Sequence, residues 1–490
     1  MNEMKQKQNQ QTAAAPAEGK IMNISLKSFL TALIMLFCLM VLTYAFTFIL
    51  PAGEYQRVVE DGKEMILNGT YAPVDGGIPF WKWLLSPFLA LTAGGGGSVI
   101  AIVIFLLVIG GAFNALEAAG IMAYMLGRIR SAFANKKYAL LVIVSLFFMC
   151  LGSFVGSYEE CVPMVPLAVA LACSLGWDPL VGLGMSLLAV ACGFSAGVCN
   201  PFTVGVAQEV AGLPMFSGVS FRLLTFALIY GLLLLFLVIY AKRIEKNPEK
   251  SLVYDPARAQ QQQKLLADFR KEDSKDKALV TFAAVLGCGI LLIFLSALVP
   301  FLQDIIMPLV AVIFLAAGIS STLVSGMKGK DLWKHFRHGM GEILPAVLLI
   351  LMANSIRYTM TEAKILDTIL HGVVRLTEGA SQGTVILLIY LLVLVMNFFI
   401  SSGSAKAFLL MPLIGPLADL AEISRQSAVL AFVYGDGFSN VFYPTNPVVL
   451  ISLGVVGLSY GKWAKWTLSF QITIIAVTAA LLQLAVAVGY

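Results

Sequence analysis

The chain has 490 residues, of which 59% are hydrophobic and 12% are charged, whereas soluble domains carry about 25% charged residues. This composition excludes an ordinary soluble protein, and several apolar runs approach or exceed the roughly 20 residues that cross a bilayer. The formal net charge of +5 is spread over tails and loops, so it indicates membrane topology and not nucleic-acid binding. The seven cysteines lie in apolar stretches without a metal-type spacing, so we expect packing residues and no cofactor.

The chain opens with a polar segment rich in Gln and Ala, and we expect residues 1–28 to be a disordered cytoplasmic tail. Four lysines precede the first apolar run, which places the N-terminus in the cytoplasm. The first transmembrane half, residues 29–241, starts with spans near 29–50 and 98–117. Between them, residues 51–78 carry five acids and two bases, as suits the outer face.

Residues 138–176 contain two apolar arms, each about 15 residues long, on either side of a polar stretch from Gly152 to Glu160. Arms of this length are too short to cross comfortably, so we interpret the segment as a re-entrant hairpin whose tip stops near mid-membrane. Such a tip needs cover by protein or by a wet cavity. The alternative is two short spans joined by an outer loop, which would place the strongly charged linker 242–277 outside, against the charge rule for topology.

The rest of the chain completes two related halves. A span near 180–212 is interrupted at 193–203, and a span near 223–241 leads to a cytoplasmic linker, residues 242–277. The second half, residues 278–490, is expected to contain spans near 279–301, 305–324, 343–360, 426–450 and 465–488, an amphipathic stretch at 363–377 and an outer hairpin at 383–422. We therefore predict an all-α polytopic membrane protein with about nine transmembrane helices and two re-entrant hairpins in an inverted repeat, its C-terminus external.

The two halves share sequence words at a nearly constant offset. Met164-Val165-Pro166-Leu167 precedes Asn200-Pro201, and Leu410-Met411-Pro412-Leu413 precedes Asn446-Pro447, so both pairs are 246 residues apart. Gly193-Phe194-Ser195 and Gly437-Phe438-Ser439 are offset by 244 residues. Related apolar halves with Pro/Gly-interrupted polar stretches at matching places are typical of secondary transporters, which bind substrate where the interruptions meet.

Four charged residues lie inside these interrupted stretches. Glu159 and Glu160 occupy the inner tip, Lys406 the outer tip, and Asp436 the second interruption. A charge at mid-bilayer costs at least about 2.5–3.5 kcal/mol on insertion scales, so we expect these residues to line the substrate site. Glu160 aligns with Lys406 at the 246-residue offset, and the four formal charges sum to −2. The alternative for Glu160 and Lys406 is a buried ion pair that locks the hairpins together, and both roles are compatible.

Each interruption also contains an Asn-Pro step, and proline removes a backbone donor and disfavours helix before it. Freed carbonyls suit sodium ions and half-helix N-termini suit a substrate carboxylate; the alternative is a plain proline kink whose asparagines repair lost hydrogen bonds. The residues expected to bind substrate are Ser157, Glu159, Glu160, Asn200, Thr203, Ser402, Gly403, Ser404, Lys406, Asp436, Ser439, Asn440, Thr445 and Asn446. The coupling ion is expected to be Na⁺ or H⁺, and sodium would lie near Gly156, Ser195, Asn200, Ser404 and Thr445.

Paired hairpins followed by broken spans are similar to the ion transporter superfamily. Gly-x-x-Glu159-Glu160 before Pro166, Ser402-Gly403-Ser404 before Met411-Pro412-Leu413, and Gly435-Asp436-Gly437-Phe438-Ser439 before Tyr443-Pro444-Thr445 resemble the YfcC-type branch of the C4-dicarboxylate anaerobic carrier (DcuC-like) family. The resemblance implies a homodimer in which a transport part moves like an elevator against a scaffold part, and some members are described as basic amino acid antiporters. The Ser-Asn-Thr hairpin word of the dicarboxylate carriers is absent from both tips, which speaks against dicarboxylate binding.

Two transport functions fit these residues. In an antiporter for arginine-like or ornithine-like amino acids, the three acids pair with amines and Lys406 with the carboxylate. In a sodium- or proton-coupled C4-dicarboxylate carrier, Lys406 and the hairpin hydroxyls hold the carboxylates. Two other functions fit an inverted repeat less well. One is a hydrolase that uses Ser402 or Ser404 with Lys406, and the other is an open channel. We therefore predict a secondary active transporter of the cell membrane that acts on a small molecule and is not an enzyme.

Overall fold

The computed structural model describes residues 26–60, 63–67, 69–93, 96–133, 136–254, 272–296, 306–377 and 379–490. Residues 1–25 of the expected tail and residues 255–271 of the expected linker lie outside these segments. Within the described segments nearly all regular structure is helical, as the sequence predicts, and six helices are long and apolar enough to cross a membrane. Four shorter apolar helices accompany these six.

The first half is a run of helices with short interruptions. They are α2 (Leu26–Ile49), α3 (Phe80–Leu84), α4 (Ser86–Leu89), α5 (Gly96–Ala118), α6 (Ile121–Phe133), α7 (Lys137–Cys150), α8 (Val165–Ser174), α9 (Pro179–Leu183), α10 (Ala189–Ser195), α11 (Val206–Val210) and α12 (Val219–Lys246). A π-helical turn continues α7 to Val155, and a 3-10 helix, η3 (Glu159–Met164), leads into α8. The two arms of the expected inner hairpin therefore meet at residues 156–158, where Gly156 adopts the left-handed conformation that ends the first arm.

The second half contains the corresponding elements. They are α14 (Asp273–Ser296), α16 (Ile306–Val324), α17 (Gly329–Glu362), α18 (Leu366–Arg375), α19 (Gln382–Phe399), α20 (Gly403–Leu420), α21 (Arg425–Gly437), α22 (Pro447–Val456) and α23 (Tyr460–Ala487). Serine side chains at residues 381, 402 and 424 accept backbone N–H bonds at the starts of α19, α20 and α21, as N-caps do. α17 is longer than the expected span 343–360, because the basic segment before it continues the same 34-residue helix.

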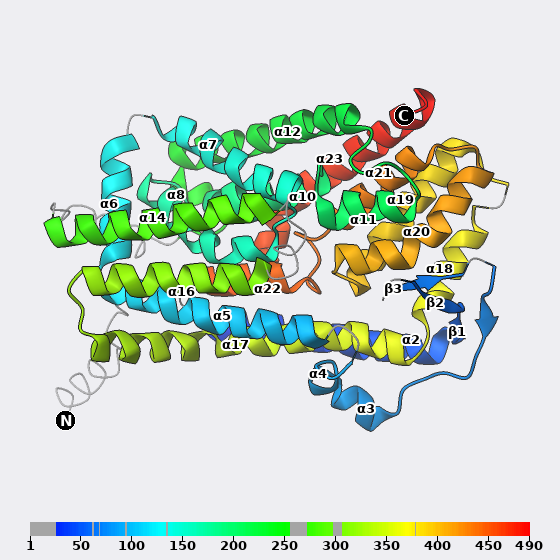
Figure 1. Cartoon of the computed structure of the whole chain (residues 1–490), viewed down its shortest axis with the longest axis horizontal. Coiled ribbons are helices and arrows are strands. Elements are labelled where there is room, and N and C mark those ends of the chain that lie inside the picture. The colour runs from blue at the N-terminus through cyan, green and yellow to red at the C-terminus, as the bar shows by residue number, and fades with distance from the viewer. Residues whose placement is uncertain are drawn as a thin grey trace, which may run out of the picture.

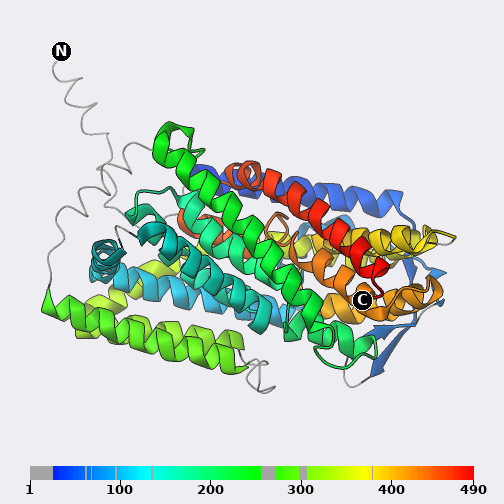
Figure 2. The same cartoon turned by 90° about the horizontal axis from the view of Figure 1, so that it is seen from above.

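The helices form two layers, one below the other in Figure 1. The first layer contains α2, α5, α16 and α17, and the second contains the helices of both expected hairpins and both interrupted spans. α14 packs on α16 and is drawn above it in Figure 1. α5 and α17 approach so closely that a Cβ added to Gly339 would lie 2.2 Å from the Gly110 carbonyl oxygen. α12 and α23 run across the second layer (Figure 2), and α22 packs on both α17 and α8. The layers therefore meet along α22, and α16 also packs on η3 of the inner hairpin.

Residues 51–78 contain four short strands that the all-α prediction missed. β1 (Gly53–Glu54) pairs antiparallel with β4 (Ala72–Pro73), and β2 (Arg57–Glu60) pairs antiparallel with β3 (Lys63–Ile66). They lie at the end of the molecule that also holds α18 (Figure 1).

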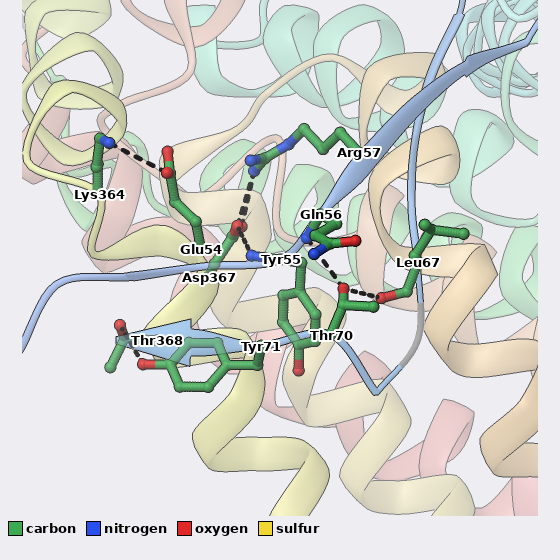
Figure 3. Close-up of polar contacts among 10 residues, drawn as sticks. All are labelled: Glu54, Tyr55, Gln56, Arg57, Leu67, Thr70, Tyr71, Lys364, Asp367 and Thr368. Carbon is green, nitrogen blue, oxygen red and sulfur yellow. Dashed lines mark hydrogen bonds and ion pairs between the residues drawn. The ribbon is translucent and has the colours of Figure 1, made fainter. Parts of the chain in front are cut away.

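The buried carboxylate of Asp367 in α18 holds these strands in place (Figure 3). It accepts hydrogen bonds from the Tyr55 backbone N–H at 3.0 Å and from the Arg57 guanidinium at 2.8 Å. Beside it, the Tyr71 hydroxyl bonds Thr368 at 2.9 Å. β3 also packs against α20. The four strands therefore connect α18 to α20, the second arm of the outer hairpin.

Candidate substrate-binding site

A buried ion pair lies at the centre of the second half. The Lys406 ammonium of α20 is 2.5 Å from a carboxylate oxygen of Asp436 in α21, and both side chains are 0% exposed. The sequence placed both residues in the site but aligned Lys406 with Glu160. The ion pair of Lys406 is with Asp436 instead, and the described residues contain no ion pair of Glu160. The expected lock between the two hairpins is therefore replaced by a pair within one half.

Asn397 of α19 connects this pair to the second interruption. Its side-chain oxygen accepts a hydrogen bond from the Lys406 ammonium, and its amide donates to Ser439 at 2.7 Å and to Asn440 at 3.0 Å. Asn446 continues the network by donating to Asn440 at 3.0 Å. Our sequence reasoning missed Asn397, although it is an asparagine in an otherwise apolar stretch, nine residues before Lys406.

Matching asparagines begin the second segment of each interrupted span. The Asn446 side chain accepts the backbone N–H of Val448 at 3.0 Å, and the Asn200 side chain accepts that of Phe202 at 2.9 Å. Each asparagine thus caps the helical segment that its proline starts, at the position where N-caps are favoured. The plain-kink alternative explains these two bonds but leaves the Asn200 amide without a partner among the described residues.

The outer hairpin tip inserts between the two interruptions. The Ser404 hydroxyl donates to the Phe202 carbonyl oxygen at 3.0 Å. A Cβ added to Gly403 would lie 2.8 Å from the Thr203 methyl carbon and 2.9 Å from a carboxylate oxygen of Asp436. Glycine is therefore required at position 403 by this close approach. The tip therefore brings Thr203 of the first half and Asp436 of the second half close to one residue, Gly403.

The inner hairpin tip packs on the first interruption. A Cβ added to Gly156 would lie 2.3 Å from the Asn200 side-chain oxygen. Ser153 donates to the Ala196 carbonyl at 2.8 Å and accepts the Val198 N–H at 3.0 Å. The tip and the interruption are therefore one packed unit.

Several buried polar atoms of that unit have no hydrogen-bond partner among the described residues. They are the Ser157 hydroxyl, the Tyr158 hydroxyl, the Asn200 amide nitrogen and the Thr203 hydroxyl. Buried polar groups are hydrogen-bonded in the great majority of cases, so a cluster of orphaned donors needs an explanation. A polar ligand that binds beside the first interruption supplies one.

The remaining expected site residues differ in burial. Glu160 is buried, and its carboxylate accepts the Tyr158 backbone N–H at 3.1 Å. Glu159 is partly exposed, and Thr445 is buried. Ser402 is exposed and accepts the Ala405 N–H at 3.4 Å, so its hydroxyl caps α20.

The five residues expected near sodium do not all contact one another. Gly156 contacts Asn200, while Ser404 donates to Phe202 and Ser195 donates to the Ala191 carbonyl at 2.8 Å. Among the described residues no three His, Cys, Asp or Glu side chains are placed to hold a metal ion together.

Arg222 of α12 is a buried cation that the sequence placed just before a span and did not single out. Its guanidinium donates to the Val198 carbonyl at 3.1 Å, to the Ser217 carbonyl at 2.7 Å and to the Tyr490 hydroxyl at 3.2 Å. The bond to the Val198 carbonyl lies within the first interruption. Arg222 therefore positions the backbone just before Asn200.

Six apolar helices of membrane length, together with interrupted helices that meet at buried polar and charged side chains, define a multi-pass membrane transporter. The chain belongs to the C4-dicarboxylate anaerobic carrier family, DcuC, whose family model matches residues 29–487. This match confirms the family that the motifs of the sequence resemble.

Two curated relatives align over most of the chain. An Escherichia coli (strain K12) protein named "Putative basic amino acid antiporter YfcC" is 31% identical over 396 residues, which cover 77% of this chain and 76% of that protein. A Haemophilus influenzae (strain ATCC 51907 / DSM 11121 / KW20 / Rd) protein is 26% identical over 428 residues, which cover 85% of this chain and 77% of that protein.

Two solved structures also align over most of the chain. The YdaH transporter of Alcanivorax borkumensis is 19% identical with a TM-score of 0.43, over 94% of this chain and 99% of that one. MtrF of Neisseria gonorrhoeae, described as one of a class of antimetabolite efflux pumps, is 17% identical with a TM-score of 0.44, over 93% and 95%. At these TM-scores we base no inference on either structure.

Proposed function

We propose that the chain is an antiporter for basic amino acids. The observation that carries this proposal is the Lys406–Asp436 ion pair, because it neutralises the buried cation of the site internally. Glu159 and Glu160 then remain without an ionic partner among the described Lys, Arg and His side chains. A site with residual negative charge attracts a cationic substrate and disfavours a dianion.

The orphaned donors beside the first interruption supply the other half of the recognition. The Asn200 amide, the Thr203 hydroxyl and the Ser157 hydroxyl are suited to the substrate carboxylate. Glu160 is suited to an ammonium or guanidinium group of the same substrate. This arrangement changes the expected role of Lys406, which pairs with Asp436 and not with the substrate.

The two-layer organisation supports an elevator-type motion. The orphaned donors beside the first interruption and the ion pair belong to the second layer, while the first layer is a closely packed group around α5 and α17. Sliding the second layer along the first would carry the substrate groups together from one face of the membrane to the other. Exchange of one basic amino acid for another needs no net charge movement, so antiport is favoured.

A C4-dicarboxylate carrier is the second candidate, and the description of the family model favours it. A dianion placed beside the orphaned donors would face Glu160 at close range. Roughly two or more bound cations would then be needed to balance the charge. The printed name of the Escherichia coli relative favours the basic amino acid instead.

Counterflow in proteoliposomes tests this proposal. Purified protein is reconstituted with unlabelled substrate inside, and entry of labelled arginine, ornithine or succinate is followed with and without a sodium gradient. We expect arginine or ornithine to enter and to compete with each other, and succinate not to enter without sodium. Sodium-dependent succinate entry that excess arginine does not inhibit would overturn the proposal.

Glu160→Gln tests the residue assigned to the amine. A charge-assisted hydrogen bond is worth about 1.5–3 kcal/mol, so arginine affinity should fall roughly 10-fold to 150-fold while the protein stays folded and inserted. Glu249→Gln is the matched control, because Glu249 is an exposed glutamate in the 3-10 turn Pro248–Lys250 that follows α12. Near-normal arginine entry by Glu160→Gln would remove Glu160 from the site.

A further inference from the structure

The N-terminal part of α17 carries a row of exposed cations. Lys330, Lys334 and Arg337 are all exposed. Their spacing of four and then three residues places them on one side of the helix, within an arc of about 60°. Trp333 lies at the edge of the same side and is 61% exposed. We call these four residues the basic face.

The opposite side of this segment packs on α5 and fixes the direction of the basic face. Leu332 and Phe336 are each 7% exposed, and a Cβ added to Gly111 of α5 would lie 2.7 Å from the Phe336 ring. The Trp333 ring stacks on Phe336, with 5.7 Å between the ring centroids and 11° between the planes. The exposed indole is therefore held in place through Phe336, and the basic face points away from the protein.

The basic face continues the lipid-facing side of the span that follows it. Leu344 and Leu348 are 57% and 37% exposed, and they lie on the same side of the helix as Arg337. α17 has 34 residues and is therefore about 51 Å long, which exceeds the hydrocarbon core of about 30 Å. The excess falls on the charged N-terminal part. The exposed side of α17 thus passes from hydrocarbon at Leu344 to the headgroup region at Arg337 and Lys334.

The cations of the basic face have no anionic partner among the described residues. No ion pair there includes Lys330, Lys334 or Arg337, and Asp331, the only acid between residues 328 and 341, pairs with none of them. The same end of the molecule holds α6 and the start of α14 (Figure 1). Other bases there have acidic partners 2.7–3.3 Å away, namely Arg128 with Asp276, Lys137 with Glu245 and Lys275 with Glu272.

Unpaired cations at this depth favour contact with lipid phosphates. A Lys or Arg near an anionic membrane surface strengthens the attraction about 5-fold, so three together favour an anionic over a zwitterionic headgroup by up to about 100-fold. Tryptophan is enriched at the same interface, where its ring lies beside apolar groups and its N–H faces polar ones. The basic face thus combines the charge and the aromatic ring that suit an anionic lipid.

We propose that the basic face is a docking surface for anionic phospholipids. The side chains of Lys330, Lys334 and Arg337 donate hydrogen bonds to the lipid phosphates, and the Trp333 ring packs beside the first carbons of the acyl chains. Because α17 belongs to the first layer, the bound lipids fix the depth of that layer in the membrane. This inference goes beyond the proposed function and holds for any substrate.

Quenching of Trp333 fluorescence by brominated lipids tests the proposal on the full chain in liposomes. Trp81→Phe provides the background, because the other four tryptophans are at most 5% exposed and Trp333 then remains the only widely exposed one. Phosphatidylcholine liposomes receive a small mole fraction of brominated phosphatidylglycerol or, in a parallel sample, the same fraction of brominated phosphatidylcholine. The ratio of the two quenching values measures the enrichment of the anionic lipid beside Trp333.

We expect a several-fold enrichment of the anionic lipid beside the unchanged basic face. Replacing Lys330, Lys334 and Arg337 with Gln should abolish it, since each lost cation lowers the preference about 5-fold. Exposed substitutions of this kind leave the protein folded. Salt near 1 M should also abolish the enrichment, because the Debye length falls to about 3 Å. Equal quenching by the two lipids with the basic face intact would overturn the proposal.

The matched control combines Arg243→Gln, Lys246→Gln and Lys250→Gln. These bases are also exposed, at the end of α12 and in the turn after it, but Glu245 and Glu249 alternate with them. The control should keep the enrichment. A loss equal to that of the basic-face variant would mean that net charge attracts the lipid, and the proposal would be wrong. If inorganic phosphate at constant ionic strength abolishes the enrichment, the basic face binds a soluble phosphate and the lipid assignment is wrong.

Discussion

Replacing Asp436 with Asn should destabilise the folded protein, because it leaves the Lys406 ammonium buried without its carboxylate. Both side chains are 0% exposed, and the ion-pair distance is 2.5 Å. Removing one member of a buried ion pair costs about 3–5 kcal/mol. Asn397 would still accept a hydrogen bond from Lys406, so we expect a loss near the lower limit, about 3 kcal/mol. Lys406→Met should lower the stability by a similar amount, since it leaves the buried Asp436 carboxylate without its cation.

The double variant Lys406→Met with Asp436→Asn separates two roles of the pair. Neutral residues of similar volume often replace a buried ion pair at little cost. If the pair mainly holds the outer tip against the second interruption, the double variant should regain at least about 1 kcal/mol relative to the sum of the single losses. It should also regain part of the arginine counterflow that both single variants lose.

Thermal unfolding of purified protein in detergent measures the stability, and counterflow in liposomes measures the transport. Asp419→Asn is a matched control, because Asp419 forms an ion pair with Arg425 at 2.6 Å on the surface. Exposed pairs contribute about 0–1 kcal/mol, so this variant should unfold nearly as the wild type does. A double variant that is as stable as the wild type but wholly inactive would refute the structural role and make Lys406 a substrate ligand.

Three further outcomes are expected. Asn397→Leu should lower the unfolding temperature and the counterflow rate, because it removes the acceptor of Lys406, and a variant with wild-type values would contradict the network. Gly437→Ala should abolish counterflow, because its Cβ would lie 2.1 Å from the Ser195 hydroxyl, whereas Gly415→Ala meets nothing within 4 Å and should be active. Burial raises the pKa of the Asp367 carboxyl above its usual range, so the folded state binds the proton of this carboxyl more tightly than the unfolded state does. The protonated Asp367 therefore stabilises the folded state at low pH, and this stabilisation is lost as the pH rises through the raised pKa. Asp367→Asn should therefore weaken the fall in unfolding temperature between acid and neutral pH, and an unchanged slope would count against this assignment.

The interruptions could be located from sequence because proline and its preceding residue act locally. Asn200-Pro201 and Asn446-Pro447 specify a helix start wherever they occur, since the asparagine caps the segment that the proline begins. The repeat then predicted that both of these helix starts lie at the substrate site. The all-α class follows from composition alone, and the strands of residues 51–78 were missed because they are only two to four residues long.

The pairing of charges could not be read from the repeat. The 246-residue offset aligned Glu160 with Lys406, but an alignment relates equivalent places in two halves and says nothing of which side chains touch. Contact depends on how α19, α20 and α21 pack, and that packing brings Asp436 to Lys406. Arg222 was missed for a related reason, because its partners are backbone carbonyls, which no residue pattern reveals.

The two ends of α12 predict that the linker and Tyr490 lie on opposite sides of the membrane. The helix has 28 residues and is therefore about 42 Å long, which exceeds the hydrocarbon core of about 30 Å. Near its start, Arg222 donates to the Tyr490 hydroxyl at 3.2 Å. Near its end, Tyr240 and Ser251 both donate to Asp178 at 2.6 Å, so the first linker residues are held at the other end.

Labelling of intact cells with an impermeant maleimide tests this topology. Because Ser251 is engaged by Asp178, the exposed neighbour Lys250 is the better site for a cysteine, and Val488, which is 62% exposed, serves at the other end. In a background whose seven native cysteines are replaced, Val488→Cys should label in intact cells and Lys250→Cys only after permeabilisation. Labelling of Lys250→Cys in intact cells would place the linker outside and make residues 138–176 two spans joined by an outer loop. The inner tip would then no longer be a re-entrant tip, and the carboxyl groups of Glu159 and Glu160 would belong to the outer surface.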